Sequence, residues 1–82
     1  MTVAKAINKA TAIFAKQGPE LGDIRTVKLM SGCHSGKDWS QLTICVEYAI
    51  NGDYTASDNH PFMVEVWDKD GKITAERITY EG

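Results

Sequence analysis

The side chains best suited to binding a metal ion in this chain are two cysteines and two histidines, Cys33, His34, Cys45 and His60. Thiolates and imidazoles form structural zinc sites, whose ligands follow one another at short, regular spacings. These four residues match no such spacing, and adjacent Cys33 and His34 could not readily turn toward one ion from a strand. We therefore expect no bound metal or cofactor and two free thiols. A Cys33–Cys45 disulfide is the alternative if strand pairing brings the two residues together.

Two glycine-containing segments resemble ligand-binding loops without meeting their requirements. The first contains Gly36-Lys37, but a phosphate-binding P-loop has four residues between its glycines and Ser or Thr after its lysine. Here three residues intervene and Asp38 follows. The second segment resembles part of an EF-hand calcium loop. When it is aligned with such a loop, Val66 and Arg77 occupy two positions at which calcium binding requires carboxylates. Both segments are therefore predicted to be β-turns without a ligand.

The segment from Asp53 to His60 contains an acid, hydroxyls and an imidazole, the groups of a catalytic triad. Such groups normally converge from separated parts of a fold, so their adjacency in the sequence is no evidence for catalysis. Long loops do often carry function, which keeps a simple enzyme among the alternatives. We assign no catalytic residue and expect a protein that is not an enzyme.

Length and composition limit the class of protein. The chain has 82 residues, of which 43% are hydrophobic and 24% charged, with a formal net charge of −2. These values predict one globular domain spanning residues 1–82. Nine Lys and Arg without a basic cluster disfavour nucleic acid as a partner. With no long apolar run and no secretion signal at the amino end, the sequence predicts a cytoplasmic protein without a membrane segment.

The first predicted element is an amphipathic helix over residues 2–17. Thr2 can cap its amino end, and Gly18-Pro19 is a typical stop signal. Apolar residues recur at helical spacing on one face, which we expect to pack on the core: Val3, Ile7, Ala10 and Phe14.

Four strands are predicted after the helix, at residues 24–31, 39–50, 62–68 and 72–80. Asp70-Gly71 supplies the positive φ angles of a tight hairpin turn between the last two. A glycine-containing turn is expected over 31–38, and a long polar loop over 51–61. No crossover segment separates successive strands, so the sheet should be an antiparallel meander. The fold class is therefore α+β, with one amino-terminal helix packed across a four-stranded sheet.

The predicted strands carry large apolar residues on both faces. One face should lie under the helix, and its residues include Val27, Leu29, Leu42, Ile44, Val46, Tyr48, Phe62, Val64 and Val66. The other, which we call the outer face, has no helix to cover it and carries aromatic and methionine side chains typical of protein interfaces. Six candidate interaction residues lie on it: Met30, Trp39, Met63, Trp67, Ile78 and Tyr80.

At the level of architecture, a helix followed by an antiparallel sheet resembles cystatin-like and NTF2-like α+β folds. The stretch Val64–Ile73 is similar to the penultimate hairpin of many such domains. The resemblance implies a fold and transfers no functional residue, because the NTF2-like enzymes build a deep cone with additional helices.

The outer face suggests the function. We expect a non-enzymatic protein-interaction or regulatory module, forming a homodimer or binding another protein, in which Trp67→Glu would abolish association. One alternative is a small-molecule-binding protein or simple enzyme with a pocket between the sheet and the loops around His34 and His60. Another is a structural subunit of a larger assembly.

Overall fold

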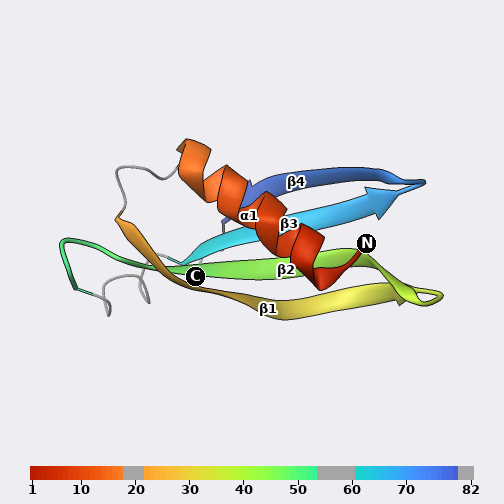
Figure 1. Ribbon diagram of the computed structural model, residues 1–82, viewed down its shortest axis with the longest axis horizontal. Coiled ribbons are helices and arrows are strands. Elements are labelled where there is room, and N and C mark those ends of the chain that lie inside the picture. Colours follow the sequence, from red (N-terminus) through yellow and green to blue (C-terminus); the bar gives the residue numbers. More distant parts are fainter. Residues whose placement is uncertain (18–21, 54–60, 80–82) are drawn as a thin grey trace.

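The computed structural model describes residues 1–17, 22–53 and 61–79, and it contains one helix and one sheet (Figure 1). The elements are α1 (Val3–Gln17), β1 (Asp23–Ser35), β2 (Asp38–Ala49), β3 (Phe62–Lys69) and β4 (Lys72–Ile78). Neighbouring strands pair antiparallel in the order β1-β2-β3-β4. The predicted α+β fold, a helix packed on a four-stranded antiparallel meander, is confirmed. No helix among the described residues has the length and apolar character needed to cross a bilayer.

Helix α1 begins at a hydroxyl cap. The backbone N–H of Lys5 donates to Thr2 Oγ1 at 3.2 Å, which satisfies one of the N–H groups that a helix leaves free at its first turn. One side of α1 is buried, through Ala6, Ala10 and Phe14. The Phe14 ring lies 5.4 Å from the ring of Tyr48 and 4.9 Å from that of Phe62, centroid to centroid. These aromatic contacts fix the helix over the two central strands.

The core lies between α1 and one face of the sheet. The helix packs chiefly on β2 and β3, and Figure 1 shows it crossing them obliquely. Alternate residues of β2 and β3 point toward the helix because side chains alternate between the faces of a strand. The largest fully buried side chains all belong to this set: Leu42, Ile44, Val46, Tyr48, Phe62, Val64 and Val66. The residues predicted to lie under the helix on these two strands are the ones found there.

Two tight turns form, of which the one at Asp70-Gly71 was predicted and the one at Asn51-Gly52 was predicted to be the start of a long polar loop. Asp70 and Gly71 have φ angles of 53° and 85°, and Lys69 pairs with Lys72 across the turn. This is the hairpin predicted for the segment, rather than a calcium loop. Asn51 and Gly52 form a second such turn.

The first hairpin differs from its prediction. The turn is only Gly36-Lys37, and β1 extends through residues predicted to be a long turn. The prediction placed Gly32 in the turn, whereas it is a strand residue that pairs with Leu42. A Cβ on Gly32 would lie 2.5 Å from Leu42 Cδ2 and 2.8 Å from Trp39 Cε3. The glycine therefore makes room for two large side chains within the paired strands.

The outer face is less exposed than its composition predicts. Thr43, Cys45 and Met63 point away from the helix-side core, yet they are only 6 to 8% exposed. Conversely, Leu29 lies opposite Ile44 on the helix side and is 37% exposed, because α1 packs mainly on β2 and β3 and covers β1 less. The position of the single helix, rather than alternation alone, decides which side chains are covered.

Candidate functional site

The candidate interaction residues that the structure describes, Met30, Trp39, Met63, Trp67 and Ile78, do not form one surface. Met30 is 53% exposed and lies at a register shift in β1, between Leu29 and Ser31. Trp67 and Ile78 are half-buried on β3 and β4, on the far side of β2 from Met30. Tyr80 lies outside the described residues.

Trp39 is not on the outer face where the sequence predicts it. It is half-buried and packs against the core cluster under the helix. Its ring reaches the space above Gly32 and stacks on His34, with 3.7 Å between ring centroids. A register shift between Cys33 and His34 accompanies this arrangement at the end of the hairpin. The register shift leaves Ser40 without a paired residue on β1, which turns Trp39 to the helix side of the sheet, and Gly32 leaves room there for its ring.

The centre of the outer face is partly polar. The row that includes Met63 is apolar, because Met63 pairs with Cys45 on one side and Ile78 on the other. The next row pairs Glu65 with Thr43 and with Glu76. Met63 is only 6% exposed within one chain, so it offers a partner little surface. The apolar part of the outer face is therefore narrow, and Trp67 and Ile78 are half-buried on it.

The two cysteines do not lie close together. Cys45 pairs with Lys28, five residues along β1 from Cys33, which separates the two thiols by about 16 Å at 3.3 Å per residue. Both are free, as predicted, with Cys33 exposed and Cys45 buried. His60 lies outside the described residues. Among those that are described, no three His, Cys, Asp or Glu side chains are grouped so that they could hold a metal ion.

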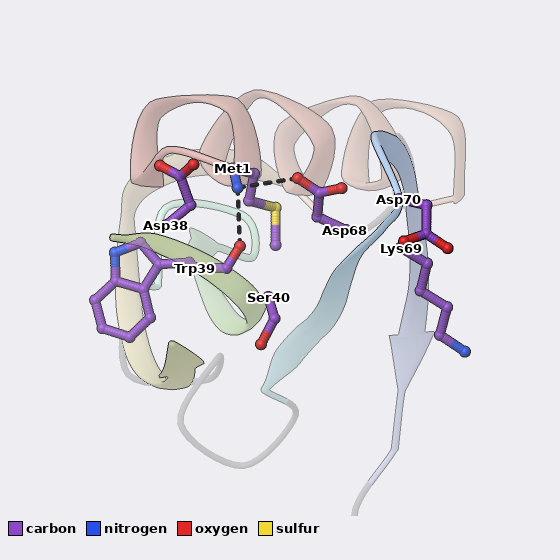
Figure 2. Close-up of a pocket in the computed structure, with 7 residues that line it drawn as sticks. All are labelled: Met1, Asp38, Trp39, Ser40, Asp68, Lys69 and Asp70. Atoms are coloured by element: carbon purple, nitrogen blue, oxygen red, sulfur yellow. Dashed lines mark hydrogen bonds and ion pairs between the residues drawn. The ribbon is translucent and has the colours of Figure 1, made fainter. Parts of the chain in front are cut away.

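A cavity of about 390 Å³ lies where the amino terminus meets the starts of β2 and of the β3–β4 turn. Figure 2 shows the seven lining residues, which come from all three segments: Met1, Asp38, Trp39, Ser40, Asp68, Lys69 and Asp70. The Met1 ammonium is at its centre. It donates to the Trp39 carbonyl at 2.8 Å and to Asp68 Oδ2 at 3.0 Å. The backbone N–H of Trp39 in turn donates to the Met1 carbonyl at 3.2 Å.

Asp68 is the electrostatic centre of this cavity. Its pKa is lowered from the ordinary aspartate value, first by the hydrogen bond and charge of the Met1 ammonium and also by the backbone N–H of Gly71. The Gly71 N–H donates to Asp68 Oδ1 at 3.1 Å, so each carboxylate oxygen has a partner. A carboxylate that is held ionised in this way acts as an anchor rather than as a proton acceptor.

The lining groups do not form a catalytic set. The only hydroxyl among them, that of Ser40, donates to the Cys33 carbonyl at 3.1 Å. His34 does not line this cavity, so the alternative pocket beside His34 is not found there. The arrangement joins the amino terminus to two strands, which is a structural role.

Sequence reasoning missed two features. Ile24 and Leu29 are exposed on β1, although Leu29 was expected to be covered by the helix. The pairing of Met1 with Asp68 spans 67 positions of the chain and leaves no local pattern. Comparison with protein-family models, curated proteins and solved structures finds no match to this chain.

Proposed function

We propose that this chain is a non-enzymatic protein-interaction module that forms a homodimer through strand β1. The position of its exposed apolar side chains supports the proposal. Among the described residues, the exposed large hydrophobics are Ile24, Leu29 and Met30, at 38%, 37% and 53%. All three belong to β1, although the strand is one of four. Apolar side chains that gather on one element are typical of a surface that meets a partner.

Strand β1 also has a free edge. It is the first strand in the sheet order, and its described partner is β2 alone. It is 13 residues long, more than twice the usual length of a strand. An edge of this length presents backbone N–H and C=O groups that can pair with a second chain. Figure 1 shows β1 along one margin of the sheet, where only the amino-terminal end of α1 comes near it.

The irregularities in β1 favour a closed dimer over open-ended assembly. Register shifts occur between Ile24 and Thr26 and between Leu29 and Ser31. Bulges of this kind interrupt a regular edge and limit continuous strand addition. We therefore place the dimer contact mainly on the side chains of Ile24, Leu29 and Met30, with backbone pairing confined to short stretches between the bulges.

The expected affinity is modest. Complete burial of a fully exposed Ile, Leu or Met gains about 1.5–3 kcal/mol. These side chains are about a third to a half exposed, so each contributes about 0.5–1.5 kcal/mol, and six of them in a dimer about 3–9 kcal/mol. Association costs about 4–15 kcal/mol. The most favourable difference, about 5 kcal/mol, corresponds to a dissociation constant of a few hundred micromolar, so the dimer should form only at high protein concentration.

Light scattering across a concentration series tests the proposal. The wild type should pass from monomer to dimer as its concentration rises, and Met30→Glu should remain a monomer with an unchanged circular dichroism spectrum. Met30 is the most exposed of the three residues, so the variant should fold. A wild type that stays monomeric at millimolar concentration would contradict the proposal.

Trp67→Glu is the matched control, because Trp67 is half-buried on the outer face and away from β1. It should dimerise as the wild type does. Loss of the dimer in Trp67→Glu, with retention in Met30→Glu, would instead assign the interface to the outer face of β3 and β4.

A further inference from the structure

A groove lies between α1 and β4, at the edge of the sheet opposite β1. It consists of two overlapping hollows of about 540 and 450 Å³ that share Lys9, Ala12 and Ile73. Figure 1 shows α1 above the sheet with β4 along its margin. Hollows of this size are in the range of small-molecule sites, which is about 300–1,000 Å³.

Small side chains leave this space open. Ala12 and Ala15 line the groove from the helix, and Ala75 lines it from β4. The deeper surface is apolar, because Ile13 and Ile73 are half-buried there against the core cluster. Larger residues at the three alanine positions would close the gap between the helix and the strand. The groove thus presents aliphatic surface to any occupant.

Lysines form the rim. Helix α1 contains three lysines and no Asp or Glu, although the whole chain has a formal net charge of −2. Lys5, Lys9 and Lys16 recur at i, i+4 and i+11, a spacing that aligns them along one side of a helix over about 16 Å. All three line the hollows. Three of the nine basic residues therefore lie beside the apolar groove, on a helix that carries no acidic residue.

The three lysines differ in whether an acidic group lies near them. Lys5 lies near enough to Asp68 to help lower the pKa of that carboxyl. The ion pairs found within the described part of the chain, Met1 with Asp68 and Lys28 with Glu47, involve neither Lys9 nor Lys16. These two ammonium groups flank Ile13 and are the ones placed to receive an anion.

We propose that this groove binds a small anionic amphiphile, a carboxylate with an unbranched aliphatic chain. The chain would lie on Ile13, Ile73 and Ala75, and the carboxylate would meet Lys9 and Lys16. The combination of apolar floor and cationic rim selects this chemistry, since a neutral chain leaves the ammonium groups unused and a cation is repelled by them. The site is independent of the proposed dimer contact on β1, so each proposal can fail without the other.

Titration of the ¹⁵N-labelled protein with decanoate, followed by NMR, tests the site. Shift changes should concentrate at residues of the groove: Lys9, Ala12, Ile13, Lys16, Ile73 and Ala75. Decyltrimethylammonium, which has the same chain and the opposite charge, should bind at least about five-fold more weakly. A peptide of six glutamates, which has charge without a chain, should produce no saturable change. The proposal would be overturned if decyltrimethylammonium or the glutamate peptide bound as tightly as decanoate. It would also be overturned if the chemical-shift changes caused by decanoate were centred outside the groove.

Two variants test the lysine rim and the apolar floor of the groove separately. Replacing both Lys9 and Lys16 by Gln should weaken decanoate binding by about five- to thirty-fold, while Lys37→Gln in the distant β1–β2 turn should not change it. Ala12→Phe should fill the groove and abolish binding, and its unchanged melting temperature would show that the fold is intact. Decanoate affinity that survives both changes would exclude this site.

Discussion

At the scale of the residue, Asp68 connects segments that lie far apart in the sequence. Its two carboxylate oxygens hold the Met1 ammonium and the Gly71 N–H, so one side chain links the amino terminus to the β3–β4 turn. The same ammonium also reaches the Trp39 carbonyl on β2. The lowered pKa of Asp68 follows from these contacts, and it has a consequence for stability.

Asp68→Asn should lower stability at neutral pH and reduce the loss of stability in acid. Because the folded-state pKa is lowered, the stabilisation is present above the unfolded value of about 4 and is lost as pH falls through the folded value. Urea unfolding at pH 7 and pH 3, on protein whose mass includes Met1, measures both effects.

Asp70→Asn is the matched control for this measurement. Figure 2 shows its carboxylate directed away from the Met1 ammonium. Asp70→Asn should keep the acid dependence of the wild type. If Asp68→Asn has the same dependence as well, the ion pair does not contribute to stability in solution.

At the scale of the element, the β1–β2 hairpin depends on a glycine within a strand. Gly32 faces Leu42, Gln41 and Trp39 so closely that a Cβ has no room. Because one of the close atoms, the Gln41 carbonyl oxygen at 2.7 Å, belongs to the backbone, rotation of a side chain cannot relieve the overlap.

Gly32→Ala should therefore destabilise the protein by about 1–3 kcal/mol, the usual cost of forcing extra volume into packed structure. Gly36→Asn is the control, because the turn residue Gly36 has a φ of 67° and open space around its Cβ position. Asn tolerates this conformation, so the control should change stability by less than about 1 kcal/mol. Guanidinium unfolding compares the two, and equal effects would contradict the packing role of Gly32.

At the scale of the whole molecule, one helix covers one face of the sheet and leaves its edges open. The core depends on β2 and β3, where Ile44 and Val64 are fully buried opposite each other. The two surfaces proposed for binding lie at the opposite edges, on β1 and beside β4. A helix over the centre of a small sheet thus produces both the stable core and the accessible margins.

Val64→Asp should unfold the protein. It places a charge without a partner among apolar side chains, at a cost comparable with the whole stability of a domain, about 5–15 kcal/mol. Thr74→Asp, on the exposed side of β4, should change the melting temperature little. Circular dichroism on heating tests both, and a cooperative native-like transition in Val64→Asp would show that its assignment to the core is wrong.

The sequence by itself determined the helix, the order of the strands and the core, but not the extent of β1. Alternation from Leu42 to Tyr48 fixed which side of β2 meets the helix, and the spacing of Ala10 and Phe14 fixed the matching side of α1. Asp70-Gly71 determined the last hairpin, because few dipeptides adopt two successive positive φ angles readily. These signals are local, and each one repeats or lies within a few residues.

Only the tertiary structure decided which side chains remain accessible. Alternation assigns Leu29 to the helix side, but the helix lies over the central strands, so Leu29 stays exposed. Met63 faces the other way and is nevertheless buried. Trp39 turns toward the core at a register shift, where Gly32, seven residues earlier, leaves room for its ring, and Asp68 pairs with Met1 from the other end of the chain. The exposure of a side chain and its pairing depend on where distant segments of the chain pack. Local periodicity in the sequence does not carry that information.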